Sequence, residues 1–526
     1  MNLTGKNLIG NKLSSETDII FQAVSPVTGH SLEPVFYEAS QHEINEAIEL
    51  SNRAFQLYRN KTGSEKADFL EAIAEEIITL DLVLIYCAME ETGLPEGRLT
   101  GERGRTVGQL KLFAGLLREG SWVDARIDTA DPARKPIPKQ DIRSMQKALG
   151  PVGIFGASNF PLAFSVAGGD TVSAFAAGCP VIFKAHPAHP GTCELVGLAI
   201  QRAMLKTNIP EGTFSMVHGR SNIVGLSIVR HPLIKAIGFT GSFTGGKALF
   251  DEANKRPIPI PVYAEMGSTN PVFILPGILK EKGEKIAEEL AASATLGAGQ
   301  FCTNPGLVFM EESENEKYFR ATLSERLDAV NPAVMLTAGI QHNYQKGIQK
   351  LKSLEGVSIL TKKNNEIQGT KGMPTLLHAS VDLFFQKQEL EEEVFGPSTI
   401  LVTCETKQQI FQAAEKLTGQ LTATIHGTLE DLKEYNGLIN ILEQKVGRIL
   451  INGFPTGVEV CHAMVHGGPY PATSDSRSTS VGTGAIRRFT RPISYQNFPR
   501  DLLPTELKDN NPDRIWRLMD GEWSKN

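Results

Sequence analysis

From Gly150 onward, short apolar runs alternate with longer stretches of helical pattern, and this alternation limits the possible folds more than any other feature. The runs have the length and composition of buried strands. They lie at 151–155, 180–184, 214–217 and 234–239, and we expect helices between them at about 161–177, 191–206 and 221–230. Such an alternation predicts a mostly parallel sheet covered by helices.

A second alternating series begins near Ile258. It includes apolar runs at 271–275, 307–310, 399–404, 421–426 and 448–451, and a helical stretch at 280–296. Residues 41–120 are mostly helical in pattern, with one helix expected over 66–91, while 126–149 is Pro-containing, charged and extended. That stretch is predicted to be a linker or a hairpin that leaves the main body. We therefore expect two α/β domains, and a chain of 526 residues is long enough for both.

Charge and cysteine usage exclude several classes of protein. The net charge of −6 argues against a nucleic-acid binder, which usually carries a basic excess. The least charged stretch, 150–183, is interrupted by polar residues, Gly and Pro, so no membrane helix is expected. The six cysteines are scattered, without CxxC or metal-ligand spacing. Together with an N-terminus that lacks an apolar signal segment, they predict a cytoplasmic protein with reduced thiols and no bound metal.

One cysteine stands in an unusual setting. Cys302 lies in the sequence GAGQFCTNPG, between glycines and small polar residues rather than among core residues. Glycines allow main-chain N–H groups and a substrate to approach closely. A thiolate in such a place can attack a carbonyl and form a covalent intermediate. Cys302 is therefore a candidate nucleophile.

Four further motifs accompany Cys302 in a fixed order. They are GASNFP at 156–161, FTGSFTGG at 239–246, AEMG at 264–267 and EEVFGP at 392–397. Together the five motifs closely resemble the aldehyde dehydrogenase superfamily, from about Ser25 to beyond Gly467. The resemblance implies an α/β fold of two doubly wound domains, a Rossmann-like cofactor domain and a catalytic domain, plus a small β oligomerisation element.

The resemblance also implies the catalytic residues. Cys302 would be the nucleophile, Asn159 and the Cys302 main-chain N–H the oxyanion donors, and Glu265 the general base that activates water. The apolar stretch before Glu265 predicts a sheltered carboxyl with a raised pKa. The product of hydride loss would be a thioester on Cys302, which the water then cleaves.

The cofactor residues implied by the family lie in three places. Gly241, Ser242 and Gly246 open a helix after a strand, where main-chain N–H groups favour a pyrophosphate. Glu393 and Phe395 match positions at the nicotinamide ribose and ring, and Lys184 matches the lysine at the adenosine ribose. NAD-preferring members often carry a Glu three residues after that lysine, but here Pro187 stands there. Arg220 could pair with a 2′-phosphate, so we predict a preference for NADP, with NAD still possible.

The C-terminal part indicates the substrate. The segment from His466 to Pro499, with 156–161 and 184–190, resembles the α-ketoglutaric semialdehyde (2,5-dioxopentanoate) dehydrogenase subfamily. Its members oxidise that aldehyde to 2-oxoglutarate in sugar-acid or hydroxyproline breakdown. A substrate of this kind needs a cation at the far end of its pocket, and we expect Arg105 to supply it, with Phe160 as a wall. The pattern is shared with some NADP-using long-chain fatty-aldehyde dehydrogenases, which stay an alternative.

By the same resemblance, residues 1–125 and 150–258 form the cofactor domain and 259–465 the catalytic domain. Residues 126–149 and 480–500 are expected to pair as oligomerisation strands, followed by a tail over 501–526. A small-molecule aldehyde is the expected partner, and a homodimer or homotetramer the expected assembly. Two other interpretations remain: an acylating enzyme that passes its thioester to coenzyme A, against which Glu265 argues, and a non-catalytic binding or structural member, against which the intact set of Cys302, Glu265 and Asn159 argues.

Overall fold

A seven-stranded sheet forms the centre of the first α/β body. The computed structural model describes residues 3–363 and 369–526. Five neighbouring strands of the first sheet are parallel, and two antiparallel strands from the N-terminus extend one edge. Their order is β11 (Val262–Glu265), β10 (Ala236–Thr240), β7 (Val152–Phe155), β8 (Val181–Lys184), β9 (Phe214–Val217), β1 (Asn7–Ile9) and β2 (Lys12–Ser14).

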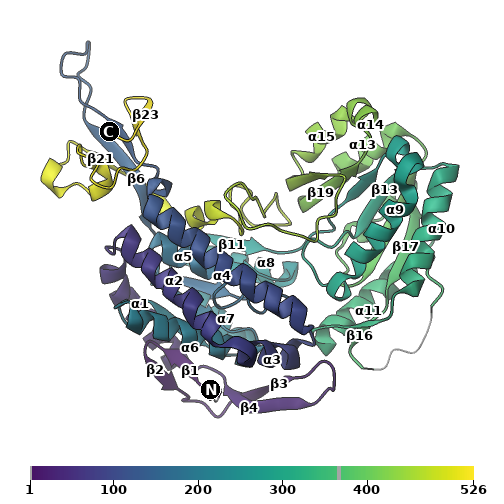
Figure 1. Cartoon of the computed structure of the whole chain (residues 1–526), viewed down its shortest axis with the longest axis horizontal. Helices are drawn as coiled ribbons and strands as arrows, with labels where there is room; N and C mark the ends of the chain where they lie inside the picture. Colours follow the sequence, from purple (N-terminus) through teal and green to yellow (C-terminus); the bar gives the residue numbers. More distant parts are fainter. Residues whose placement is uncertain (1–2, 364–368) are drawn as a thin grey trace.

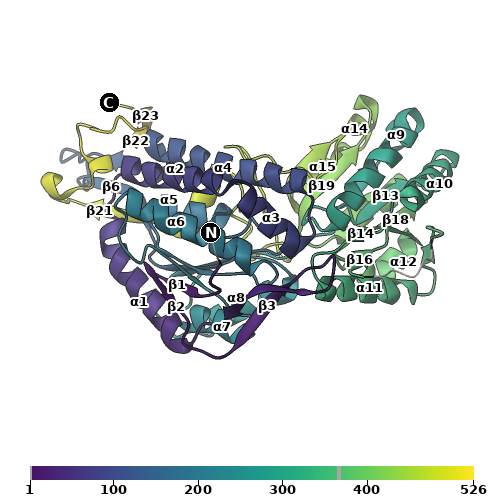
Figure 2. The ribbon, with the colours of Figure 1, turned by 60° about the horizontal axis from the view of Figure 1, so that its bottom comes forward.

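Helices cover both faces of this sheet, as Figure 2 shows. One face packs on α2 (Gly63–Thr79), α4 (Glu96–Glu119), α5 (Gly169–Ala177) and α6 (Pro190–Lys206). The other packs on α1 (Gln41–Tyr58), α7 (Asn222–Arg230) and α8 (Phe243–Asn254). Strands buried on both faces must be apolar throughout, which explains the short continuous runs in the sequence.

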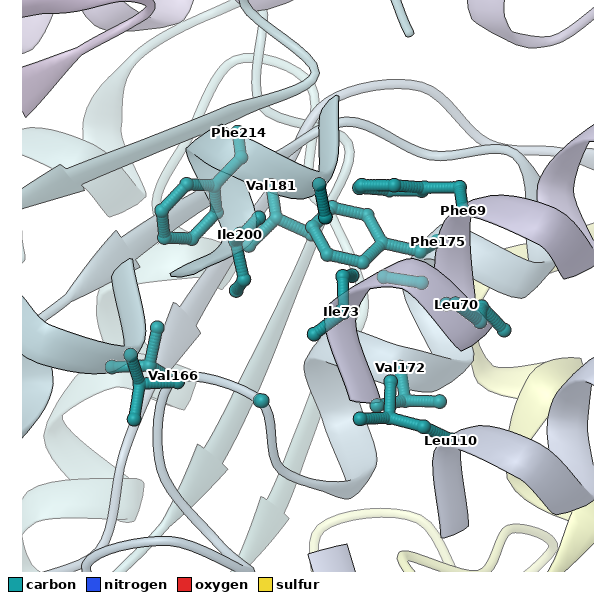
Figure 3. Close-up of a cluster of buried hydrophobic side chains, with 14 of the residues drawn as sticks. Phe69, Leu70, Ile73, Leu110, Val166, Val172, Phe175, Val181, Ile200 and Phe214 are labelled. Atoms are coloured by element: carbon teal, nitrogen blue, oxygen red, sulfur yellow. The ribbon is translucent and has the colours of Figure 1, made fainter. Parts of the chain in front are cut away.

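An aromatic cluster fills the first of these two interfaces (Figure 3). The rings of Phe69 on α2 and Phe175 on α5 lie 5.2 Å apart, and Phe175 lies 6.3 Å from Phe214 on β9. Each ring is fully buried. Burial of one such side chain contributes roughly 1.5–3 kcal/mol, so this cluster fixes the helices of the first body on its sheet.

The second body repeats the arrangement and lies beside the first (Figure 1). Its sheet has six parallel strands and one antiparallel edge strand. The order is β15 (Ser358–Ile359), β17 (Thr375–Ser380), β18 (Ser398–Cys404), β13 (Leu307–Glu311), β12 (Val272–Ile274), β19 (Gln420–His426) and β20 (Val446–Ile451). The surrounding helices are α9 (Pro276–Thr295), α10 (Glu314–Ala329), α11 (Ala338–Lys352), α12 (Val381–Gln386), α13 (Lys407–Lys416), α14 (Leu429–Glu434) and α15 (Asn436–Leu442). Two α/β bodies of doubly wound type were expected, and the structure confirms them.

The boundary between the bodies differs from the expected one. We expected the second series to begin near residue 258, but β11 pairs in parallel with β10 and so completes the first sheet. The physical reason is burial: Val262 and Ala264 pack into the apolar cluster of the first body. Glu265, at the end of β11, therefore belongs to the sheet that also carries Asn159.

Two predicted helices also differ from the observed ones. The stretch expected as one helix over 66–91 ends at Thr79 and restarts as α3 (Asp81–Thr92), because Asp81 adopts a left-handed φ of 44°. The helix expected from residue 161 begins only at Gly169. The main-chain N–H groups of Leu162 and Ala163 instead bind the buried carboxylate of Glu102 on α4, at 2.9 Å each.

A third, five-stranded sheet projects from the first body near the C-terminus (Figure 1). It contains β21 (Thr490–Gln496), β6 (Ile142–Ala148), β5 (Arg126–Asp128), β22 (Arg517–Met519) and β23 (Glu522–Ser524), in that order. The predicted pairing of the 126–149 excursion with the segment near the C-terminus is confirmed by the β21–β6 ladder. The tail contributes two more strands, so the last part of residues 501–526 belongs to this sheet.

The remaining strands form two small antiparallel pairs, β3 (Ile20–Val24) with β4 (Ser31–Tyr37) and β14 (Ala333–Val334) with β16 (Lys371–Gly372). Across residues 3–363 and 369–526, none of the helices combines the length and apolar character needed to cross a membrane.

Candidate functional site

A cavity of about 710 Å³ opens between the two bodies. The loops that follow β7, β10 and β11 line it on one side, and the loops around Cys302 and Glu393 line it on the other. The carboxyl ends of parallel strands are where doubly wound proteins bind their ligands. Asn159, Glu265 and Cys302, expected to act together, all face this cavity.

The loop that carries Cys302 is held by close main-chain contacts. Gly299 adopts a φ of 66°, and a Cβ at this position would overlap the main-chain carbonyl of Gly396. The side-chain amide of Asn270 donates to the Cys302 carbonyl at 2.8 Å and to the Asn304 carbonyl at 2.9 Å. The thiol is half-buried and faces the cavity. This support fixes the main chain around the nucleophile.

His466 lies between Cys302 and Glu265. Its Nε2 is 3.4 Å from Cys302 Sγ and 3.1 Å from Glu265 Oε1. The second carboxylate oxygen, Oε2, accepts a hydrogen bond of 2.7 Å from the Ser480 hydroxyl. An ionised carboxylate can only accept, so Nε2 carries the hydrogen in its contact with Glu265. Both partners use the same ring nitrogen, and Nδ1 is buried without a hydrogen-bond partner.

The expectation of a raised pKa for Glu265 is wrong. Burial acts to raise the pKa of this carboxyl, but His466 and the hydroxyl of Ser480 outweigh it and bring the pKa to about 2. Glu265 is therefore ionised in this arrangement. Burial, and next the charge of Glu265, raise the pKa of the Cys302 thiol well above its ordinary value, so this candidate nucleophile is held as a thiol.

Asn159 follows β7 and lines the cavity. Its Nδ2 donates to the carbonyl of Gln300 at 2.9 Å, two residues before Cys302. A side-chain amide has a second N–H, which stays available for an oxygen bound near the thiol. This geometry suits the oxyanion role expected for Asn159.

The N-terminus of α8 also opens onto the cavity, through Gly241, Ser242, Phe243 and Thr244. Ser242 is the N-cap, and its hydroxyl accepts from the Gly245 N–H at 3.2 Å. A Cβ on Gly246 would overlap the side chain of Met266, so this glycine allows α8 to pack close to the loop after β11. Main-chain N–H groups at a helix start, next to a cavity of this volume, fit a pyrophosphate-containing cofactor.

Two further residues expected at the cofactor, Glu393 and Phe395, line the same cavity from the second body. The carboxylate of Glu393 approaches Gly267, where any Cβ would meet its Oε2 at 2.6 Å. The structure thus brings the residues expected at the pyrophosphate and at the nicotinamide to one cavity.

Glu38 contacts the main chain of Arg220 and interacts with the charge of Lys184. The carboxylate of this buried residue accepts from the main-chain N–H groups of Arg220 at 2.9 Å and Ser221 at 3.0 Å. The charge of Glu38 also acts on Lys184, although burial is the larger effect and lowers the pKa of Lys184 to about 8. The Arg220 side chain is exposed. Both cations stand at the carboxyl ends of neighbouring strands, β8 and β9.

Phe160 and Arg105 belong to a cluster of rings and guanidinium groups. The Phe160 ring lies 5.3 Å from the rings of Phe164 and Phe301. The guanidinium of Arg105 lies 5.1 Å from the Phe164 ring centre and 5.9 Å from that of Phe160. The charge of Arg105 acts on Cys302 and on Glu265, so it stands near the thiol. Its Nε is buried with no hydrogen-bond partner.

Sequence reasoning missed four residues of this region: His466, Ser480, Glu38 and Glu102. No spacing rule connects His466 or Ser480 with a cysteine more than 150 positions earlier, and the stretch between Phe454 and Ser480 contains no helical or strand pattern. Glu38 and Glu102 are buried carboxylates, but a glutamate in a helical or loop pattern is normally solvated. For these residues, only the folded contacts reveal the role.

Comparisons with known proteins identify the family of the chain. The family model described as "Aldehyde dehydrogenase family" matches residues 13–476. The chain is 49% identical to alpha-ketoglutaric semialdehyde dehydrogenase 2 of Azospirillum brasilense, over 99% of this chain and 100% of that protein. It is 48% identical to alpha-ketoglutaric semialdehyde dehydrogenase of Acinetobacter baylyi, over 94% of this chain and 93% of the other.

Solved structures share the fold. Betaine aldehyde dehydrogenase of Staphylococcus aureus, in complex with NAD⁺, superposes with a TM-score of 0.80 at 19% identity, covering 94% of this chain and 95% of that one. An aldehyde dehydrogenase of Bacillus cereus in its NAD⁺ complex gives 0.79 at 20% identity, covering 93% and 96%. The family match spans most of the chain and includes the cavity residues Asn159, Glu265 and Cys302, so the chain belongs to the aldehyde dehydrogenase family.

Proposed function

We propose that this enzyme oxidises α-ketoglutaric semialdehyde to 2-oxoglutarate with a nicotinamide dinucleotide, through a thioester on Cys302. The substrate assignment rests on the identity of 48–49%, over nearly the full length, with two enzymes named for this aldehyde. The cavity supports the chemistry, because it holds a thiol, a carboxylate and an amide donor together.

In the first step, Cys302 Sγ bonds to the aldehyde carbon, and the thiol proton is released to solvent through the cavity. The carbonyl oxygen becomes an oxyanion, which the second N–H of Asn159 and the Cys302 main-chain N–H stabilise. Loss of one such donor typically lowers kcat by about 10²–10³. A bound nicotinamide supplies the hydride acceptor. The residues at 241–246, with Glu393 and Phe395, would hold this cofactor.

In the second step, water attacks the thioester carbon and the C–S bond breaks. Glu265 takes the proton of that water, and the Cys302 sulfur leaves as thiolate and recovers a proton. In the resting arrangement, His466 and Ser480 hold both oxygens of Glu265. They act as positioning residues, and loosening one of these bonds would raise the pKa of Glu265 and so its strength as a base.

NADP is the proposed preferred cofactor. Pro187 leaves no carboxylate three residues after Lys184, and the exposed guanidinium of Arg220 is available for a 2′-phosphate. The test is the ratio of kcat/KM with NADP to that with NAD. We expect Arg220→Ala to lower this ratio at least tenfold. The control is Arg230→Ala, which should leave the ratio unchanged. Arg230 is an exposed arginine at the C-terminal end of α7 and forms an ion pair with Glu252. An unchanged ratio in Arg220→Ala contradicts the assignment.

Arg105 is proposed to bind the substrate carboxylate. Its guanidinium stands over Phe164, and within the part of the chain that the structure describes it makes no hydrogen bond or ion pair. The test is a panel of the semialdehyde, a simple aliphatic aldehyde and a long-chain fatty aldehyde, each with NADP and NAD. We expect Arg105→Ala to raise KM at least tenfold for the semialdehyde only. Arg103→Ala, two residues away and close to Asp81, is the matched control.

The same panel decides between the alternatives. A wild-type preference for the fatty aldehyde contradicts the proposed substrate and supports the broad-range alternative. Product analysis with and without coenzyme A tests the acylating alternative, and absence of turnover with every aldehyde supports a non-catalytic role.

We also infer that the enzyme assembles as a homodimer or homotetramer through the sheet that contains β21 and β6. Its support is the projecting position of this sheet and the free outer edge of β21 (Figure 1). Cytoplasmic location is proposed on cysteine usage alone.

A further inference from the structure

Glu265, Cys302 and His466 converge through one donor atom each. These three atoms lie within 4.8 Å of one another. They come from three distant parts of the chain: the end of β11, the loop after α9 and the segment that returns from the second body to the first. Within residues 3–363 and 369–526, no other group of three histidine, cysteine or acidic side chains meets the same criterion.

The donor set is the one that zinc prefers. A thiolate sulfur, an imidazole nitrogen and a carboxylate oxygen bind Zn²⁺ at about 2.3, 2.0–2.1 and 2.0–2.2 Å, which places tetrahedral ligands about 3.3–3.6 Å apart. The sulfur and nitrogen here are 3.4 Å apart, and the nitrogen and oxygen 3.1 Å. An ion could therefore be bound with small shifts of the side chains.

The surroundings also suit a bound cation. Three protein ligands leave a fourth position open for water, and both Cys302 and Glu265 line the cavity, which supplies a path of entry. Ser480 already orients Glu265 through its other oxygen, as second partners of metal ligands do. Arg105 and Arg448 bring positive charge towards Cys302, which opposes a bound cation, whereas the charges of Glu265 and Glu393 favour it. A thiolate ligand favours zinc over the hard cations Mg²⁺ and Ca²⁺.

We propose that Glu265, Cys302 and His466 form a binding site for Zn²⁺ that reversibly inhibits the enzyme. Binding forms the Zn–S, Zn–N and Zn–O bonds and releases the thiol proton to solvent, while the imidazole proton moves from Nε2 to Nδ1. No electron is transferred. The metal occupies the sulfur lone pair that attacks the aldehyde and the carboxylate that activates water, so both chemical steps stop.

Metal binding itself is the test, measured without aldehyde or cofactor, so that its result is independent of the proposed substrate. Chelator-treated, full-length protein is titrated with ZnCl₂ by calorimetry, and with CoCl₂ by absorption spectroscopy. We expect one site per chain and a thiolate-to-cobalt charge-transfer band. MgCl₂ should produce no binding signal, and in a parallel assay excess chelator should restore the activity that zinc removes.

Variants locate the site. Cys302→Ser should abolish the cobalt band, His466→Gln should weaken zinc binding at least about 100-fold, and Ser480→Ala should weaken it about 10-fold. Cys461→Ser, which removes another half-buried thiol outside the cluster, is the matched control and should bind as the wild type does. Unaltered zinc affinity in His466→Gln overturns the proposal. A wild type without the charge-transfer band overturns it too, and this outcome depends on no variant.

Discussion

At the scale of single residues, Glu265 meets two opposing requirements. In the resting site it is held by His466 and Ser480 with a pKa of about 2, which keeps it ionised but makes it a weak base. A base works best when its pKa is near the operating pH. Release from one of its two partners would raise its basicity, as the proposed role in thioester hydrolysis requires.

A Glu265→Gln variant separates the two chemical steps. Its side chain cannot take a proton from water, so we expect kcat to fall by about 10²–10⁴. Thioester formation does not require an activated water, so a rapid burst of reduced cofactor, close to one per active chain, should remain. Stopped-flow absorbance measures the burst. If turnover and burst disappear together, Glu265 acts before the thioester forms; Cys302→Ser should lose both.

The lowered pKa of Lys184 leads us to predict that the choice between NADP and NAD depends on pH. Burial, the largest effect, lowers its pKa to about 8, so the free enzyme loses this charge as the pH rises through 8. Below that value Lys184 is cationic and attracts a 2′-phosphate; above it the attraction is lost. The kcat/KM for NADP, divided by that for NAD, should therefore fall between pH 7 and 9. Lys184→Gln should flatten this profile, and an equally steep fall in that variant contradicts the role.

At the scale of elements, the loop before Cys302 depends on a glycine that contacts a neighbouring loop. Ala at position 299 must adopt a left-handed φ, which costs roughly 1–2 kcal/mol, and its Cβ overlaps the Gly396 carbonyl, which typically adds about 1–3 kcal/mol. We expect Gly299→Ala to lower both the thermal midpoint and kcat, because the loop carrying Cys302 must shift. Gly453→Ala, at a glycine with open space around it, is the control and should change neither. Wild-type activity in Gly299→Ala would show that the loop tolerates displacement.

Elements defined by local patterns could be predicted from the sequence. The strand at 214–217 has the predicted bounds, and the helix at 190–206 begins one residue before its prediction. The break at Asp81 and the late start of α5 could not be predicted, because neither is marked by a local pattern. The first depends on a left-handed residue other than glycine, and the second on Glu102, which binds the N–H groups of residues 162 and 163 from another helix.

At the scale of the whole molecule, the site is completed by a segment that crosses between the bodies. After β20 the chain returns to the first sheet, where Met266 donates to the Ala472 carbonyl at 2.8 Å and Ser474 donates to the Ala264 carbonyl at 3.0 Å. This return brings His466 and Ser480 to Glu265. The five motifs, through the family that they resemble, indicated Asn159, Glu265 and Cys302, and each of these residues lies next to a recognisable strand or glycine pattern. A contact between residues 265 and 466 arises only when both sheets and the returning segment are folded.

We predict that the protein assembles through the edge of the projecting five-stranded sheet. Its edge strand β21 pairs with β6 on one side only, and an unpaired edge can take up a strand from a second copy. We expect the intact protein to have two or four times the chain mass of 57.3 kDa by light scattering. Lysines at an edge discourage such pairing, so Ser494→Lys with Gln496→Lys, both exposed, should reduce the mass to a smaller species. Leu502→Lys, exposed just beyond the strand, is the control and should leave the mass unchanged. A wild type of 57.3 kDa, or a double variant of unaltered mass, contradicts assembly through this edge.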